Sequence, residues 1–91
     1  MKKIRVLLAE DHTIVRQGLI ALLRAEPDME VVGEASDGVE AIEMAKKIIP
    51  DVVLMDIAMR NLNGLEATRR IKKLFPHIKV LILTMYDNEE W

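Results

Sequence analysis

Three acidic residues and one hydroxyl residue directly follow short apolar runs of the sequence. Glu10 and Asp11 follow the first run, Asp56 follows the third and Thr84 follows the fourth. If these runs are parallel strands, their carboxyl ends meet at one edge of the sheet, which is where open α/β sheets form their sites. A single acidic residue after a strand more often caps a helix or lies in a solvated loop. Three carboxylates on adjacent strands instead predict a shared site.

Carboxylates packed this closely repel one another, so either a cation lies among them or the pKa of at least one of them rises. The expected ligand atoms are all oxygens, with no His or Cys inside the rim, which favours a hard cation such as Mg²⁺. His12 follows the acidic pair and is interpreted as a solvated loop histidine rather than a ligand or a proton donor. Mg²⁺ beside Asp56 predicts phosphoryl chemistry, with Asp56 as the nucleophile and Thr84 as a hydrogen-bond donor to a transferred oxygen.

The elements that must position these residues follow from the hydrophobic pattern. Short runs rich in Val, Ile and Leu predict strands, and the segments between them have apolar residues at helical spacing. Strands that alternate with helices indicate a parallel sheet with right-handed crossovers, an α/β three-layer sandwich. Gly33 and a more alternating pattern place the second strand at an edge. The expected strands are 4–9, 30–35, 52–55 and 80–83, and the apolar helix faces lie within 14–23, 39–49 and 65–75.

Composition and charge exclude several classes of protein. The chain has 91 residues, of which 51% are apolar and 31% charged, so it is expected to fold as one small globular domain. It has no cysteine, which excludes disulfides and thiolate sites. The net charge of −2 argues against nucleic acid binding by bulk electrostatics. No apolar stretch approaches the ~20 residues of a membrane span, so a cytoplasmic location without membrane contact is expected.

Other polar residues are assigned to structure. Asp37 is predicted to make a turn or a helix cap, and Asp51, at the amino end of its strand, lies at the opposite rim. The basic residues near the end of the third helix are expected to complement the helix C-terminus rather than to bind nucleic acid. They are Arg69, Arg70, Lys72 and Lys73.

Several motifs together resemble the receiver domain of bacterial two-component response regulators, and their details are most similar to the NarL/FixJ subfamily. This resemblance implies a flavodoxin-like sheet with strand order 2-1-3-4. It also implies a sensor histidine kinase as partner and a C-terminal LuxR-type helix-turn-helix domain as the part that binds DNA. The motifs are VLLAEDH (6–12), VVGEASDG (31–38), DVVLMDIAM (51–59), NGLEATRRI (63–71) and VLILTMYDNEE (80–90).

The resemblance also implies a role for each matching residue. Asp56 would be the phosphoacceptor and one of the Mg²⁺ ligands. Asp11 would bind Mg²⁺ directly, Glu10 would act through water, and Ala58 would lend its backbone carbonyl. Thr84 would be the hydroxyl that swings toward the phosphoryl group.

The chain departs from the family pattern in two places. Arg60 and Asn61 stand where the family usually has Pro-Gly, so we expect a less rigid loop. The family's fourth helix, fifth strand and fifth helix have no counterpart in these residues. The family's site lysine is missing as well, because the last lysine, Lys79, precedes the fourth strand. Residues 1–91 are therefore expected to form an incomplete receiver domain without its output domain. The uncovered fourth strand is expected to promote self-association.

Two alternatives belong to other classes. A pseudo-receiver would be an interaction module that is never phosphorylated, and its signals near Asp56 would not respond to Mg²⁺. A Mg²⁺-dependent phosphohydrolase would turn over an external phosphoester, but the sequence has no insertion that could form a substrate pocket. We therefore expect a signalling domain rather than an enzyme, with at most self-phosphorylation and self-dephosphorylation.

Overall fold

A computed structural model describes residues 2–83, in which strands and helices alternate along the chain. Thr84 and the rest of the loop expected after the fourth strand lie outside these described residues. The elements are β1 (Ile4–Ala9), α1 (Thr13–Arg24), β2 (Met29–Ala35), α2 (Gly38–Ile48), β3 (Val52–Asp56), α3 (Gly64–Leu74) and β4 (Lys79–Leu83).

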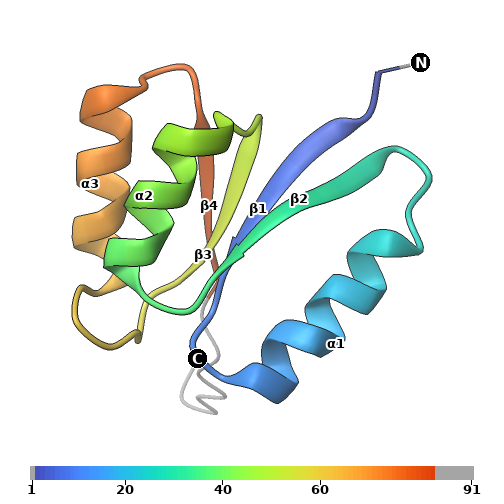
Figure 1. Cartoon of the computed structure of the whole chain (residues 1–91), viewed down its shortest axis with the longest axis horizontal. Helices are drawn as coiled ribbons and strands as arrows, with labels where there is room; N and C mark the ends of the chain where they lie inside the picture. Colours follow the sequence, from blue (N-terminus) through green and yellow to red (C-terminus); the bar gives the residue numbers. More distant parts are fainter. Residues whose placement is uncertain (1, 84–91) are drawn as a thin grey trace, which may run out of the picture.

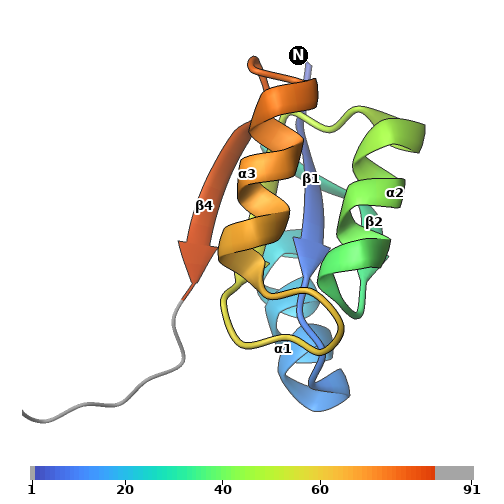
Figure 2. The same ribbon diagram turned by 90° about the vertical axis from the view of Figure 1, so that its left-hand side faces the viewer.

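The strands form one parallel sheet in the order β2-β1-β3-β4, which confirms the predicted order and the edge position of the second strand. Helices α2 and α3 cover one face of this sheet and α1 lies on the other (Figures 1 and 2). The α/β three-layer fold is therefore confirmed. Because β1 and β3 are neighbours at the centre, the residues that follow them lie close together.

The core lies between the sheet and the α2–α3 layer. Alternate residues of the central strands point into it, and Leu7, Ala9, Val53 and Met55 are fully buried there. Small residues on the facing sides of α2 and α3, such as Ala41 and Ala67, let the helices approach the sheet closely.

The opposite face is less completely covered toward β4. Among the described residues β4 pairs with β3 alone, and Leu81 on this strand is 57% exposed. An uncovered apolar side chain of this kind was expected from the sequence. The self-association inferred from it stays a prediction.

Both helices of the α2–α3 layer begin with a side-chain cap. Asp37 Oδ1 accepts a hydrogen bond from the Glu40 amide at 2.8 Å, and Asn63 Oδ1 accepts one from the Glu66 amide at 2.9 Å. The predicted cap at Asp37 is thus confirmed. Capping satisfies amides at the helix starts, which lie at the same end of the sheet as the carboxyl ends of the strands.

At the opposite rim of the sheet, Arg5 of β1 forms hydrogen bonds that link neighbouring elements. Asp51 Oδ2 accepts a hydrogen bond from the Arg5 amide at 2.8 Å, which supports its assignment to structure. The Arg5 guanidinium donates to the carbonyls of Ile48 and Ile49, at 2.8 and 2.7 Å. Arg5 therefore satisfies carbonyls that would otherwise be unpaired at the end of α2.

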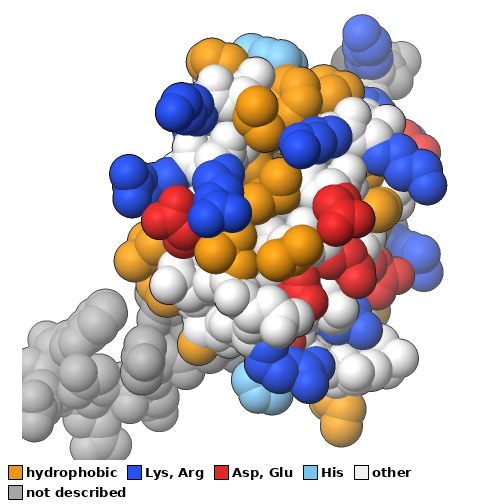
Figure 3. Space-filling model, turned by 60° about the vertical axis from the view of Figure 1, so that its left-hand side comes forward, with side chains coloured by type: hydrophobic (Ala, Val, Ile, Leu, Met, Phe, Trp, Pro, Cys, Tyr) orange, Lys and Arg blue, Asp and Glu red, His pale blue; other side chains and the backbone are white. Residues whose placement is uncertain are grey.

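The basic residues of α3 lie on its solvent side, where Lys and Arg side chains gather in Figure 3. Lys72 Nζ donates to the carbonyls of Pro76 and Ile78, at 2.8 and 2.7 Å, just beyond the end of the helix. Arg69 and Arg70 pair with Glu66 within the helix. The contacts of Lys72 agree with the predicted role of the cluster at the helix C-terminus.

No helix within residues 2–83 combines the length and the apolar character that crossing a membrane requires.

Candidate metal centre

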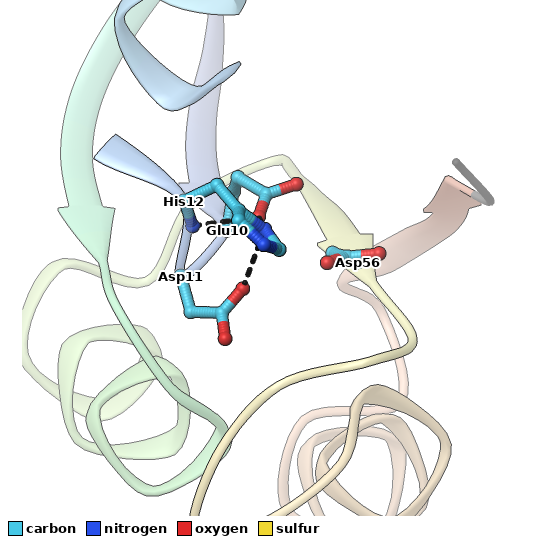
Figure 4. A group of neighbouring side chains, drawn as sticks. All are labelled: Glu10, Asp11, His12 and Asp56. Atoms are coloured by element: carbon cyan, nitrogen blue, oxygen red, sulfur yellow. Dashed lines mark hydrogen bonds and ion pairs between the residues drawn. The ribbon is translucent and has the colours of Figure 1, made fainter. Parts of the chain in front are cut away.

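Three carboxylates meet at the carboxyl end of the two central strands. Glu10 and Asp11 follow β1 directly, and Asp56 is the last residue of β3. One oxygen of each lies within 4.8 Å of the others and of a ring nitrogen of His12 (Figure 4). The structure therefore brings together the three acidic residues that the sequence placed at this rim.

These carboxylates are largely withdrawn from solvent. Glu10 is 1% exposed and Asp56 4%, while the Asp11 side chain is 14% exposed. Burial raises the pKa of Asp56, and the neighbouring carboxylates of Glu10 and Asp11 raise it further. The backbone amide of Ala58, which faces the Asp56 carboxylate, lowers the pKa of Asp56. The site thus concentrates negative charge where water screens it poorly, and a cation would offset that charge.

One carboxylate oxygen of this group is in a position that a bound cation would explain. Asp11 Oδ1 is buried, and no group among the described residues donates a hydrogen bond to it. The His12 ring nitrogen Nδ1 lies 3.1 Å from this oxygen but is hydrogen bonded to Glu10 Oε2. A buried carboxylate oxygen without a donor is costly unless a charge of opposite sign faces it. The donor set is dominated by carboxylate oxygens and therefore suits Mg²⁺.

The expectation that no histidine joins the rim is wrong. His12 Nδ1 lies 3.1 Å from both Glu10 Oε2 and Asp11 Oδ1, and the His12 amide donates to Glu10 at 2.9 Å. His12 is the residue before α1, and the turn into the helix folds its side chain back over the acidic pair. The ring is nevertheless 69% exposed, as predicted for a solvated histidine.

The acidic neighbours also change the titration of this ring. The hydrogen bond to Glu10 raises the pKa of His12, and the negative charges of Asp11 and Glu10 add to the effect. Protonation therefore places a positive charge beside the carboxylates. The only available signal in the sequence was the spacing of two residues from Glu10, which by itself does not decide the direction of a side chain.

The remaining predicted residues are placed as follows. Ala58 lies in the loop after β3, and its backbone amide faces the Asp56 carboxylate. Its side chain is exposed, in keeping with the expectation that only its backbone matters. Thr84, the predicted switch hydroxyl, is outside the described residues.

Comparison with known proteins gives concordant matches over nearly the whole chain. A family model described as "Response regulator receiver domain" matches residues 6–91. The transcriptional regulatory protein LiaR of Bacillus subtilis is 47% identical over 87 residues, which cover 96% of this chain and 41% of LiaR. The response regulator protein VraR of Staphylococcus aureus is 48% identical over 87 residues, which cover 96% of this chain and 42% of VraR. The chain thus spans about two fifths of the length of these relatives.

Solved structures show the same architecture. The response regulator domain of CheB from Thermotoga maritima aligns with a TM-score of 0.90 at 43% identity, covering 97% of this chain and 65% of that one. The receiver domain of the response regulator NarL from Mycobacterium tuberculosis aligns with a TM-score of 0.87 at 31% identity, covering 99% of this chain and 73% of that one.

Proposed function

The chain belongs to the response regulator receiver domain family, and on that premise we propose that Asp56 accepts a phosphoryl group from a sensor histidine kinase. The observation that carries this proposal is the buried Asp56 carboxylate at the end of the central strand β3, beside the acidic pair Glu10 and Asp11. A carboxylate in this position is a nucleophile close to groups that suit a divalent cation.

The transfer itself needs little from the protein beyond a nucleophile and its positioning. A carboxylate oxygen of Asp56 forms a bond to phosphorus while the bond from phosphorus to the imidazole nitrogen of the donor breaks. The electron pair of that broken bond stays on the donor imidazole. The product is an acyl phosphate on Asp56.

We propose Mg²⁺ as the cofactor of this site. Asp11, Glu10, Asp56 and the backbone carbonyl of Ala58 would hold it, with Glu10 acting through water. Once bound, Mg²⁺ supplies positive charge that offsets both the carboxylates and the oxygens of the transferred group. Asp11 Oδ1, a buried oxygen that accepts no hydrogen bond from the described residues, supports this assignment.

We further propose that residues 1–91 act as the receiver part of a transcriptional regulator in the cytoplasm, with Thr84 as its switch hydroxyl. Phosphorylation would control a DNA-binding helix-turn-helix domain and so bias transcription. The names of the relatives LiaR and VraR, a transcriptional regulatory protein and a response regulator, support this output. The same names favour signalling over hydrolysis of an external phosphoester.

Chemical trapping tests the proposed phosphoacceptor. The protein is incubated with acetyl phosphate and Mg²⁺, and the acyl phosphate is then reduced with borohydride, which converts the modified aspartate to homoserine. Peptide sequencing by mass spectrometry is expected to find homoserine at position 56. Homoserine at another aspartate, or no homoserine at any position, would contradict the proposal.

Replacing Asp11 by asparagine is expected to weaken Mg²⁺ binding by about tenfold or more, because it removes one of the negative charges that draw the cation into the site. Asp51→Asn is the matched control, since Asp51 lies at the opposite rim and hydrogen bonds to the Arg5 amide. Mg²⁺ titration followed by NMR measures both affinities. Equal Mg²⁺ affinity in the Asp11 variant and in the unchanged protein would exclude Asp11 as a ligand.

A further inference from the structure

The loop between β3 and α3, residues 57–63, is closed tightly at its base. The Gly64 amide donates to the Ile57 carbonyl at 2.8 Å. The Cα of Gly64 packs so closely on the end of β3 that a Cβ added there would lie 2.1 Å from the Asp56 carbonyl oxygen. The base of the loop is therefore held against the backbone of the proposed phosphoacceptor.

The outer part of the same loop is held by α2. Asn61 Nδ2 donates a hydrogen bond to Asp37 Oδ2 at 2.7 Å, while the other oxygen of Asp37 caps α2 through the Glu40 amide. Next to this contact, a Cβ added to Gly38 would lie 2.1 Å from the carbonyl oxygen of Leu62. Two adjacent contacts thus join the loop to the start of α2.

The hydrogen bond between Asn61 and Asp37 is charge-assisted. The Glu40 amide and, after it, the Asn61 side chain lower the pKa of Asp37, so its carboxylate remains ionised at neutral pH. Hydrogen bonds to an ionised acceptor are stronger than those between neutral groups.

Asn61 also has a backbone conformation that few residues accept. Its φ is 66°, in the left-handed region, where asparagine is one of the better tolerated residues after glycine. Asparagine therefore meets the turn's requirement at this position and adds a side-chain donor that glycine lacks.

We propose that the Asp37–Asn61 hydrogen bond is a positioning element for the metal centre, an inference that rests on the proposed function. It holds residues 57–63 against α2, so that the Ala58 peptide, whose amide faces the Asp56 carboxylate, stays beside that carboxylate. Asp37 and Asn61 act through the loop and are positioning residues rather than ligands.

Two variants cut this hydrogen bond from opposite sides with little other change. Asn61→Gly removes the donor and still permits a φ of 66°. Asp37→Asn leaves one side-chain oxygen, which keeps the α2 cap, and removes the second oxygen, which accepts from Asn61. The double variant combines the two changes.

Mg²⁺ titration of the isotope-labelled protein by NMR gives the readout, through the dissociation constant and the amide signal of Ala58. Each single variant is expected to raise the dissociation constant by about tenfold, the lower end of the effect of residues that orient metal ligands. Each is also expected to shift the Ala58 signal. Because both cut one bond, the double variant is expected to lose no more affinity than either single variant.

Arg5→Ala is the control for stability alone, because it removes contacts at the other end of α2. It is expected to lower the unfolding midpoint and leave Mg²⁺ affinity unchanged. The proposal is overturned if both single variants bind Mg²⁺ like the unchanged protein, if only one of them loses affinity, or if their losses multiply in the double variant. An equal loss of Mg²⁺ affinity in the Arg5→Ala variant would also overturn the proposal.

This readout is independent of phosphorylation. If the trapping experiment finds no homoserine at position 56, the proposed function fails, whereas the Mg²⁺ affinities and the Ala58 signal still decide whether the loop is positioned by this bond. If labelling succeeds and those two measurements are unchanged in the variants, the positioning role alone fails.

Discussion

Asp56→Asn is expected to abolish phosphoryl labelling and, at the same time, to make the protein more stable. An amide is a far weaker nucleophile than a carboxylate, so no acyl phosphate forms at this position. The substitution also removes the negative charge of Asp56, which is buried and lies beside Glu10 and Asp11. Burial and these neighbouring carboxylates are the causes of the raised pKa of Asp56. We expect a gain of about 1 kcal/mol in the free energy of unfolding at neutral pH without Mg²⁺.

The gain has a defined pH dependence. The folded protein holds the Asp56 proton more tightly than the unfolded chain, because the pKa in the folded state lies above the ordinary value of 3.8. The contribution of Asp56 to the free energy of unfolding is therefore fully present below pH 3.8 and is lost as pH rises through the raised pKa. The Asp56→Asn protein does not lose this stability. The difference in free energy of unfolding between the variant and the unchanged protein is therefore largest above the raised pKa and disappears below pH 3.8.

Urea unfolding over a pH series, with and without Mg²⁺, measures this difference. Because Asp56 is one of the proposed ligands, Mg²⁺ is expected to bind the unchanged protein more tightly than the variant and so to reduce the difference in their free energies of unfolding. A variant less stable than the unchanged protein at neutral pH without Mg²⁺ would contradict the electrostatic argument. Labelling that survives the substitution would contradict the assignment of Asp56.

Gly64→Ala is expected to lower the free energy of unfolding by about 3 kcal/mol, the upper end of the usual cost of overpacking. The added Cβ would lie 2.1 Å from the carbonyl oxygen of Asp56 and 2.9 Å from its carbonyl carbon. Both are backbone atoms, so relief requires movement of the end of β3 or of the start of α3. For a domain of this size, such a loss is a large fraction of the total stability.

Gly18→Ala is the matched control for this substitution. Gly18 lies within α1, and a Cβ added there would meet nothing within 4 Å. Alanine is the better helix former, so this variant is expected to gain about 0.5–1 kcal/mol. Urea unfolding of both variants measures the contrast. A Gly64→Ala protein as stable as the unchanged one would show that the contact with Asp56 relaxes without cost.

The hydrophobic pattern was sufficient to predict the strands and their parallel direction, whereas the full strand order came from the family resemblance. The strands expected at 4–9, 30–35, 52–55 and 80–83 match β1 to β4 to within one residue at each end. Continuous runs of Val, Ile and Leu indicate strands covered on both faces, and the helices between them impose parallel order. The three acidic residues could be placed at one rim because each lies at or just beyond the carboxyl end of a strand, and these ends coincide in a parallel sheet.

The side-chain contacts between elements could not be predicted in this way. The direction of the His12 ring depends on how the chain turns into α1, so the expectation of a rim without histidine was wrong. The Asp37–Asn61 hydrogen bond joins residues 24 positions apart, and the sequence indicated only that each could make a turn. A lower rigidity of the loop at Arg60 and Asn61 stays a prediction, now beside a contact that anchors this loop.

The sequence by itself therefore determined which residues are buried in strands and which carboxylates stand at their ends. Both depend on hydrophobic burial and on the period of each element, which are properties of short segments. Only the tertiary structure decided that Asp11 Oδ1 lacks a donor among the described residues, that His12 faces the acidic pair and that α2 holds the loop after Asp56. Those features depend on distances of a few ångströms between separate elements, which are set by how all the elements pack together.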